Sequence, residues 1–157
     1  GTVVVNGPTQ QMNGALDVGR FSVASGSVGI AQGCLDACAD YTAKRTVRGR
    51  PIRELQLIRA MLADMVTETR AARQLCEHAG RLKDAGDQRS IMATWIAKYF
   101  ATKAATRIAS NAVQIHGANG CASEYPVQRH YRDAKLSEIV EGSSEIQQLL
   151  ISDEAFR

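Results

Sequence analysis

The sequence predicts an all-α fold: an antiparallel bundle of long helices, of the four-helix up-and-down type, with a short extra helix. Three stretches repeat apolar residues at alternating steps of three and four, the spacing that forms one buried face of a helix. Almost nothing in the chain alternates with the period of two that half-buried strands require. Many positions on the apolar faces are alanine, so we expect the helix axes to approach one another closely.

The first predicted helix ends at the Gly-Arg-Pro sequence of residues 49–51, because Pro cannot continue a helix and Gly favours a left-handed cap. The second helix ends near residues 85–87, and the third ends at the glycine-rich residues 117–120. The apolar faces consist of Phe21, Ala24, Val28, Ala31, Leu35, Cys38 and Thr42 in the first helix, of Leu55, Ile58, Leu62, Met65, Thr69, Ala72, Cys76 and Ala79 in the second, and of Ala93, Ala97, Phe100, Ala104, Ile108, Ala112 and Ile115 in the third.

Two shorter helices complete the prediction. One begins at Pro126 and continues to about Lys135, because Pro is favoured in the first turn of a helix. The other begins at Glu145, with Ser143 or Ser144 as its N-cap.

Composition excludes several classes of partner. The 157 residues are 45% hydrophobic and 22% charged, and their formal net charge of +3 is spread over interleaved acids and bases. The chain contains no basic run typical of nucleic-acid or anionic-lipid binding, and aromatic residues, at 5%, are too scarce for a base-stacking surface. It also contains no signal peptide and no apolar run of the ~20 residues that a membrane span needs. We therefore expect a soluble protein that binds no nucleic acid and inserts into no membrane.

The four cysteines, Cys34, Cys38, Cys76 and Cys121, form no Cys-x-x-Cys pair. Cys34 and Cys38 share a helix face and have a spacing that would permit metal ligation. We interpret all four as small buried apolar residues with reduced thiols, which favours a reducing compartment and predicts no metal site.

A helical bundle alone implies no activity. Di-iron bundles use Glu-x-x-His pairs, and His78, His116 and His130 have no Glu three residues before them. No Ser/His/Asp or Cys/His set is apparent either. A non-catalytic helical oligomerisation module therefore remains an alternative to any enzyme.

Three motifs in the last third of the chain are more specific. They are Gln-Ile-His-Gly-Ala-Asn-Gly at residues 114–120, Arg-His-Tyr-Arg-Asp-Ala-Lys at 129–135, and Glu-Ile-Val-Glu-Gly-Ser-Ser-Glu-Ile-Gln at 138–147. In order and spacing they resemble the C-terminal signature of the acyl-CoA dehydrogenase family. Residues 16–20 and 41–45 resemble the family's first helix and the junction that follows it, so the likeness covers the chain from about residue 10 onward.

The resemblance implies that Glu141 is the catalytic base, which removes the α-proton of an acyl thioester. A carboxylate beside an apolar acyl slot loses hydration and becomes more basic, and the tight turn at Gly142 fits such a site. Some family members place the base on the first helix instead, just before the arginine that matches Arg20. That position is Gly19 here, which leaves Glu141 as the candidate.

The resemblance also implies a substrate site and a cofactor, FAD. Asp17, Arg20 and Gly142 match residues near the acyl-CoA, although Asp17 and Arg20 would alternatively form an ordinary ion pair on the helix surface. The residues that match FAD contacts are Arg45, Gln56, Gln114, Gly117 and Ser143. In the family, the residues like Arg45 and Gln114 contact the FAD pyrophosphate and adenosine of a neighbouring subunit.

Two positions depart from the family pattern. The family commonly has Phe before the glycine that matches Gly49, whereas this chain has Arg48, so an apolar contact near the adenine is missing. Val140 replaces a frequent aromatic residue before the base, which indicates a differently shaped acyl slot.

The implied parent has three parts: an N-terminal helical domain, a β domain that holds the flavin, and this helical domain. Residues 1–10 are interpreted as an entering linker and 11–157 as the domain. The implied reaction is α,β-dehydrogenation of an acyl-CoA or acyl-carrier thioester, with electrons passed to an electron-transfer flavoprotein, or to oxygen in a related oxidase. The chain alone is expected to be inactive and without tightly bound FAD.

We further expect a homodimer or homotetramer in the cytoplasm, or in the mitochondrial matrix of a eukaryote. Apolar residues outside the main face of the third helix predict a second buried surface. They are Ile91, Met92, Trp95, Ile96 and Tyr99.

Overall fold

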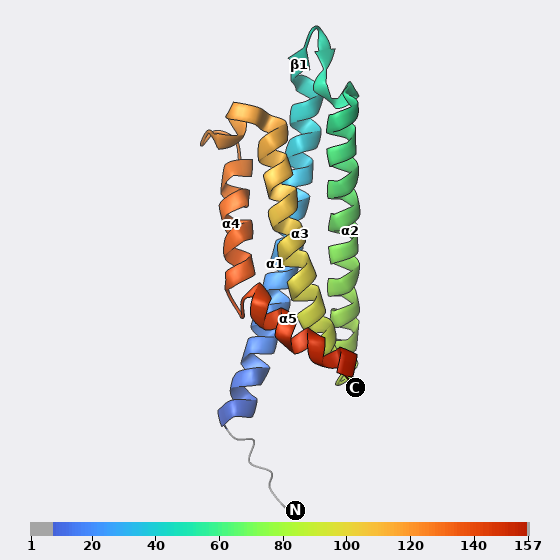
Figure 1. Ribbon diagram of the computed structural model, residues 1–157, viewed down its shortest axis with the longest axis vertical. Helices are drawn as coiled ribbons and strands as arrows, with labels where there is room; N and C mark the ends of the chain where they lie inside the picture. The colour runs from blue at the N-terminus through green and yellow to red at the C-terminus, as the bar shows by residue number, and fades with distance from the viewer. Residues whose placement is uncertain (1–7, 157) are drawn as a thin grey trace, which may run out of the picture.

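The computed structural model describes residues 8–156, with side chains described from residue 16 onward, and it confirms the all-α bundle. Its helices are α1 (Pro8–Lys44), α2 (Gln56–Asp84), α3 (Ser90–His116), α4 (Val127–Ile139) and α5 (Ser144–Ser152). The first four run up and down in turn, and α5 crosses one end of the bundle (Figure 1). Within the described range, no helix combines the length and the apolar character needed to cross a lipid bilayer.

The entering linker expected at residues 1–10 overlaps the first helix. Residues 1–7 lie outside the described part of the chain, and α1 starts at Pro8. Residues 8–10 are therefore helical.

The first helix ends earlier than predicted, at Lys44. Two short antiparallel strands follow, β1 (Thr46–Val47) and β2 (Arg50–Pro51), and the 3₁₀ turn η1 (Ile52–Glu54) leads into α2. Arg48 and Gly49 between the strands both have positive φ, 52° and 76°, as a type I′ hairpin turn requires. A positive φ at Gly49 suits a hairpin turn as well as a helix C-cap. For this reason the end of the first helix was predicted too late in the sequence.

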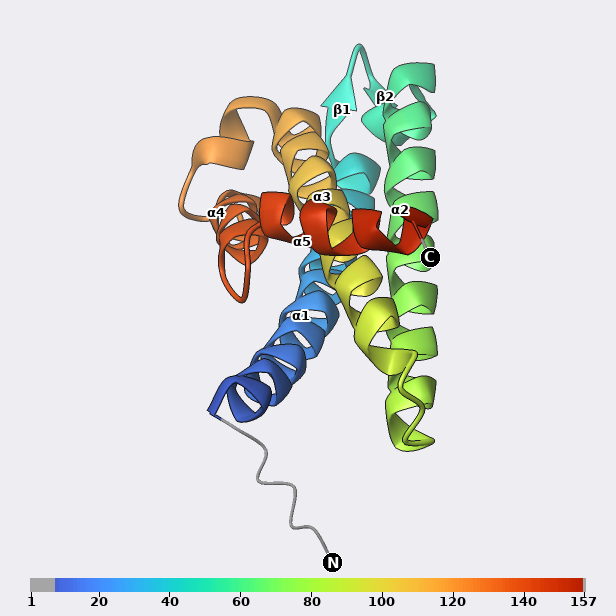
Figure 2. The same cartoon turned by 60° about the horizontal axis from the view of Figure 1, so that its bottom comes forward.

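Helix α3 is the centre of the bundle and packs against α1, α2, α4 and α5. In Figure 2, α5 lies across α3 on its way from α4 toward α2. The buried face of α3 is rich in small residues, which lets its neighbours approach closely, and the fully buried alanines are Ala97, Ala101, Ala104, Ala105, Ala109 and Ala112. The predicted apolar faces are largely confirmed, with Leu55 as an exception because it precedes α2 and is 47% exposed.

The later breaks fall where the sequence predicts them. Helix α3 stops at His116 because Gly117 adopts a φ of 60°, and the 3₁₀ turn η2 (Gly117–Cys121) follows. A side chain at Gly120 would put its Cβ 2.5 Å from the Val113 carbonyl oxygen, so the turn needs glycine there. Helix α4 continues to Ile139, beyond the predicted end.

The start of α5 also agrees with the sequence. Ser143 occupies the N-cap position and the first helical residue is Ser144. The chain then closes with the 3₁₀ turn η3 (Asp153–Phe156).

The prediction that all cysteines are buried is correct for Cys34, Cys38 and Cys76 and wrong for Cys121. Burial raises the pKa of Cys34 and of Cys38 to about 12, so both thiols stay protonated at neutral pH. Cys121 is exposed because it ends the surface turn η2.

Candidate active site

The turn between α4 and α5 carries Glu141 in an unusual backbone conformation. Glu141 has a φ of 58° and Gly142 a φ of 94°, so both lie in the left-handed region. Glycine adopts this region freely, whereas for glutamate it costs on the order of 1–2 kcal/mol. Other contacts must therefore hold Glu141 in place.

Two cations from other helices supply those contacts. The Lys98 ammonium, on α3, donates to the Glu138 carbonyl oxygen at 3.1 Å and to the Gly142 carbonyl oxygen at 2.6 Å. Arg20 Nε, on α1, donates to the carbonyl oxygen of Glu141 at 3.2 Å. Hydrogen bonds from charged donors are roughly twice as strong as neutral ones, so the turn is fixed on both sides of Glu141.

The carboxylate of Glu141 lies against Gly19 of α1. A Cβ added at Gly19 would be 2.3 Å from Glu141 Oε2, so the space that the carboxylate occupies exists only because residue 19 has no side chain. Neither carboxylate oxygen accepts a hydrogen bond from the residues that the structure describes. The structure thus brings together Gly19 and Glu141, the two positions that the sequence analysis compared as places for a base.

Asp17 and Arg20 do not pair with each other. The Asp17 carboxylate forms an ion pair with Lys83 of α2, and its Oδ1 is buried without a hydrogen-bond partner among the described residues. The guanidinium of Arg20 lies 5.6 Å from the centroid of the Trp95 ring. Arg20 therefore belongs to the Glu141 turn, whereas Asp17 joins α1 to α2 one helical turn away.

The start of α5 contributes more polar groups to the same region. The Oγ of Ser144 and both amide atoms of Gln147 are buried and have no hydrogen-bond partner among the described residues. A Cβ at Gly142 would be 2.9 Å from Gln147 Nε2, so this amide packs directly against the turn. A hydrogen bond from Ser143 is the main cause that lowers the pKa of Glu145.

The surroundings of the turn change the pKa of Lys98. Its side chain is fully buried, and desolvation lowers its pKa from 10.5 to about 8, although Glu138 counteracts the shift. Lys98 remains largely charged at neutral pH.

The predicted cofactor residues other than Ser143 lie near the opposite end of the bundle. Arg45 follows α1, Gln56 begins α2, and Gln114 and Gly117 lie at the end of α3. All four residues are exposed.

Of these four, only Arg45 lines a cavity of about 460 Å³ at that end. Lys44 adds a second cation, and Asn119 donates to the hydroxyl of Tyr41 at 3.1 Å. Tyr41 stacks on His116 with ring centroids 4.1 Å apart and donates to the His116 carbonyl oxygen at 3.2 Å. Burial lowers the pKa of His116, which favours the neutral ring. The cavity therefore combines two cations and the Asp40 carboxylate with an aromatic wall.

The two groups of predicted residues are far apart. Lys98 beside the Glu141 turn and His116 beside Arg45 are both on α3, and eighteen residues of helix correspond to about 27 Å. Within one chain, Glu141, Gly142, Arg20 and Ser143 are brought together, and Arg45 is not brought to them.

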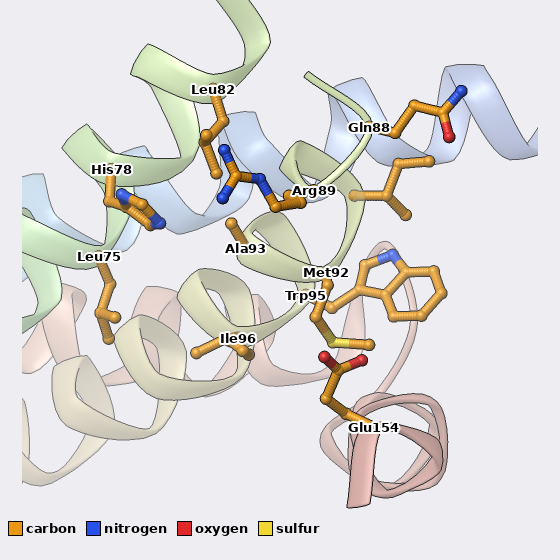
Figure 3. Close-up of a pocket in the computed structure, with 11 residues that line it drawn as sticks. Leu75, His78, Leu82, Gln88, Arg89, Met92, Ala93, Trp95, Ile96 and Glu154 are labelled. Carbon is orange, nitrogen blue, oxygen red and sulfur yellow. The ribbon is translucent and has the colours of Figure 1, made fainter. Parts of the chain in front are cut away.

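A larger cavity of about 650 Å³ separates the C-terminal part of α2 from the start of α3 (Figure 3). Its walls include Leu75, Met92, Trp95 and Ile96, and Met92 lies beside Glu154 of η3. Five apolar residues were expected to form a second buried surface on α3. Four of them line this cavity together with residues of other elements: Ile91, Met92, Trp95 and Ile96. Tyr99, the fifth, accepts a hydrogen bond from Gln148 of α5.

Lys98, the most deeply buried charged residue of the site, was not predicted from the sequence. A signal was present: Thr94, Lys98, Thr102 and Ala105 recur at helical spacing among small residues, and all four are buried. A lysine within such a face needs buried acceptors, which the α4–α5 turn provides.

Comparison with known proteins assigns the fold and the motifs to one family. The chain matches the family model "Acyl-CoA dehydrogenase, C-terminal domain" over residues 6–156. The human mitochondrial short-chain specific acyl-CoA dehydrogenase is 44% identical over 142 residues, which cover 90% of this chain and 34% of the human protein. Subunit CarC of the caffeyl-CoA reductase-Etf complex of Acetobacterium woodii is 43% identical over 137 residues, covering 87% of this chain and 36% of that subunit.

Solved structures agree. Butyryl-CoA dehydrogenase from Megasphaera elsdenii superposes with a TM-score of 0.89 at 38% identity, covering 92% of this chain and 38% of that one. The chain spans about a third of the length of the curated relatives it matches. It belongs to the acyl-CoA dehydrogenase family and corresponds to that family's C-terminal domain.

Proposed function

We propose that this chain supplies the catalytic base for α,β-dehydrogenation of an acyl-CoA thioester, as the C-terminal part of an FAD-dependent acyl-CoA dehydrogenase. The observation that carries the proposal is the Glu141 carboxylate, which lies over Gly19 and whose backbone is held by Arg20 and Lys98. Family membership implies a flavin, and the names of several relatives specify a CoA thioester.

In the proposed reaction, a Glu141 oxygen takes the α-proton of the thioester. The carboxylate suits this step because no described residue donates a hydrogen bond to it, so both oxygens keep their basic lone pairs. The tethered backbone fixes where the side chain starts, and orientation of this kind lowers the entropic part of a barrier. When bound, FAD would supply the acceptor for the hydride that leaves the β-carbon.

The residues available fit FAD at two places. Ser143 adjoins the base, and the buried, unpartnered amide of Gln147 lies in the same turn region. At the opposite end, Arg45 and Lys44 offer donors for phosphate oxygens beside the aromatic ring of His116.

Because about 27 Å of helix separates the two places, we propose that they serve two different FAD molecules. Arg45, Gln56, Gln114 and Gly117 would contact the cofactor of a neighbouring subunit, which makes the working enzyme a homodimer or homotetramer. The symmetric exchange of such contacts is the arrangement expected of a closed homo-oligomer.

The two residues proposed to contact the substrate, Arg20 and Asp17, have different surroundings. Arg20 lies at the Glu141 turn, where it fits a role next to the reacting end of the substrate. Asp17 has one carboxylate oxygen engaged by Lys83, so only the other oxygen is available to accept a hydrogen bond from the CoA arm.

For the electron acceptor we propose an electron-transfer flavoprotein. The name of the Acetobacterium woodii relative places that protein in a complex with Etf, which supports this choice. The free thiols of Cys34, Cys38, Cys76 and Cys121 suit a reducing compartment, the cytoplasm or the mitochondrial matrix.

The experiment that tests the function replaces the base in the full-length, FAD-loaded enzyme. Glu141→Gln keeps the size of the side chain and removes its basic lone pair, so reduction of the flavin by butyryl-CoA should slow by roughly 10²- to 10⁴-fold while FAD stays bound. Stopped-flow absorbance at the flavin band measures the rate.

Two neighbouring glutamates serve as controls. Glu138 pairs with Lys135 at 3.3 Å, and Glu145 is exposed on α5. Their Gln variants should remain within a few-fold of the unmodified enzyme. Near-normal reduction in Glu141→Gln, combined with loss in either control, would show that the base has been assigned to the wrong residue.

A further inference from the structure

We propose that Lys98 is a positioning residue for the base: it ties α3 to the carbonyl groups on both sides of Glu141 and keeps the carboxylate in register with the substrate. The inference rests on the proposed function, because it concerns how the same base is held.

The geometry singles out Lys98. Its side chain is fully buried, and its ammonium spans the turn by donating to the carbonyl oxygens of Glu138 and Gly142. Glu138 is in the last turn of α4 and Gly142 precedes α5. One cation therefore fixes the exit of one helix and the entry to the next, with Glu141 between them.

Arg20 completes the arrangement from another direction. Its Nε binds the carbonyl oxygen of Glu141 itself, from α1. The carbonyls of residues 138, 141 and 142 are thus all held by cations that belong to two other helices. Without such tethers the left-handed Glu141 would gain by relaxing toward an ordinary conformation, and the carboxylate would move with its backbone.

A purely structural role would not need a charge at this position. Burial disfavours the ammonium, because transfer of a charged group out of water costs free energy that an apolar side chain of similar volume would not cost. The charged groups that face Lys98 are Glu138 from α4, Glu141 from the turn, Arg20 from α1 and Glu145 from α5. Of these, Arg20 repels the ammonium, whereas the carboxylates of Glu138, Glu141 and Glu145 attract it, and the attraction of Glu138 is the largest.

Protonation of Lys98 adds a second consequence. The pKa of Lys98 is lowered to about 8 by burial, so the ammonium becomes a neutral amine as the pH rises past that value. A neutral amine is a weaker donor to the two carbonyls, and the tether loosens. We therefore expect the rate of flavin reduction to decline on the alkaline side of about pH 8.

The test compares Lys98→Met with Lys103→Met in the full-length, FAD-loaded enzyme. Methionine keeps an unbranched side chain of similar length and removes the donor. Lys103 is a matched control, since it is on the same helix and contacts the Tyr99 ring, with its Nζ 5.5 Å from the centroid, rather than the turn. Flavin reduction by butyryl-CoA is followed from pH 6 to pH 10, and amide hydrogen exchange is measured over residues 138–145.

We expect Lys98→Met to slow flavin reduction on the order of 10- to 100-fold, with FAD content and substrate affinity nearly unchanged. Its alkaline decline should disappear, and exchange over residues 138–145 should quicken. Lys98→Arg keeps the charge at high pH and should restore part of the rate without the decline. If Lys98→Met does not fold, the alkaline decline of the unmodified enzyme and its absence from Lys98→Arg decide the question.

The outcomes separate the two proposals. A Lys98→Met enzyme that matches Lys103→Met in rate and in pH profile overturns the positioning role, even if Glu141→Gln is inactive. An alkaline decline of the rate that persists unchanged in Lys98→Arg would also overturn the positioning role. Normal turnover in Glu141→Gln overturns the proposed function itself.

Discussion

At the α5 end of the bundle, the turn that carries Glu141 is fixed by Lys98 and Arg20 from two other helices. At the hairpin end, Arg45 and Gln114 project from exposed positions, and no hydrogen bond of the described residues engages either side chain. The same chain therefore preorganises one set of candidate residues and leaves the other set open.

The difference follows from what each set is proposed to do. A base must reach one proton with its carboxylate in a narrow range of positions, so its backbone needs rigid support from the same chain. Phosphate contacts need only cations that approach the ligand, and long exposed side chains can adjust when the ligand arrives. The buried hydrogen bonds that hold the Glu141 turn match the first requirement. The open cavity lined by Lys44 and Arg45 matches the second.

The largest effect that we predict concerns the free energy of unfolding of the whole protein, which depends on the proton bound by Lys98. Because the folded-state pKa of Lys98 is depressed, the unfolded chain binds more protons than the folded one between about pH 8 and pH 10.5. Stability should rise with pH in that window, and the full difference between the two pKa values corresponds to roughly 3 kcal/mol. Calorimetry of the full-length enzyme and of Lys98→Met should show this rise in the difference between the two proteins.

If the stability difference between the unmodified enzyme and Lys98→Met did not change with pH in that window, Lys98 would not be buried as a cation. The contrast between the two ends of the bundle would then be contradicted. Below about pH 8 the contribution of Lys98 to stability should not change with pH, because both states are then protonated.

The second effect concerns the open end. Arg45→Ala should weaken FAD binding by on the order of 10- to 100-fold, since a hydrogen bond to a charged group contributes about 1.5–3 kcal/mol. The rate of flavin reduction at saturating FAD should stay the same, because Arg45 is remote from Glu141. Fluorescence titration of the full-length apoenzyme with FAD measures the affinity.

Arg53→Ala is the control for Arg45, since Arg53 is also exposed and lies in η1 at the same end. A change of the reduction rate in Arg45→Ala, with unchanged affinity for FAD, would contradict the division of labour between the two ends.

The smallest predicted effect is that of a substitution at Gly19, which should change stability and the rate of flavin reduction in opposite directions. Gly19→Ala should stabilise α1 by about 0.5–1 kcal/mol, because alanine loses less backbone entropy in a helix than glycine. The new Cβ would meet Glu141 Oε2, which is the far end of a flexible side chain, so the carboxylate shifts and flavin reduction slows while the fold persists. Thermal melts and stopped-flow reduction of the full-length enzyme check both parts.

Gly26→Ala is the matched control for Gly19, because it is in the same helix and a Cβ there meets nothing within 4 Å. It should give the same gain in stability at an unchanged rate. Equal rates in the two variants would mean that the carboxylate of Glu141 is not held against Gly19 during the reaction.

Periodicity predicted most of this fold, because long amphipathic helices leave a strong signal. The apolar faces and the breaks at Gly86 and Gly117 needed only local information. The hairpin after Lys44 was missed, since the positive φ of Gly49 suits a helix cap and a hairpin turn equally.

The candidate site was predicted less completely. Glu141, Arg20 and Gly142 came from motifs and do lie together. The pairing of Asp17 with Lys83 and the reach of Lys98 to the turn depend on how helices far apart in sequence pack, and no local pattern encodes that. The separation of Arg45 from Glu141 likewise becomes visible only in three dimensions.

The central claim is that the two ends of one chain serve two different active sites. It is tested most directly by mixing full-length Glu141→Gln subunits with Arg45→Ala subunits, at an FAD concentration where each variant alone is nearly inactive. A mixed dimer would contain one site with both defects and one site with none, so random mixing should restore about one site in four to normal activity. No recovery above the two separate variants would contradict the account, because both ends of each chain would then serve the same site.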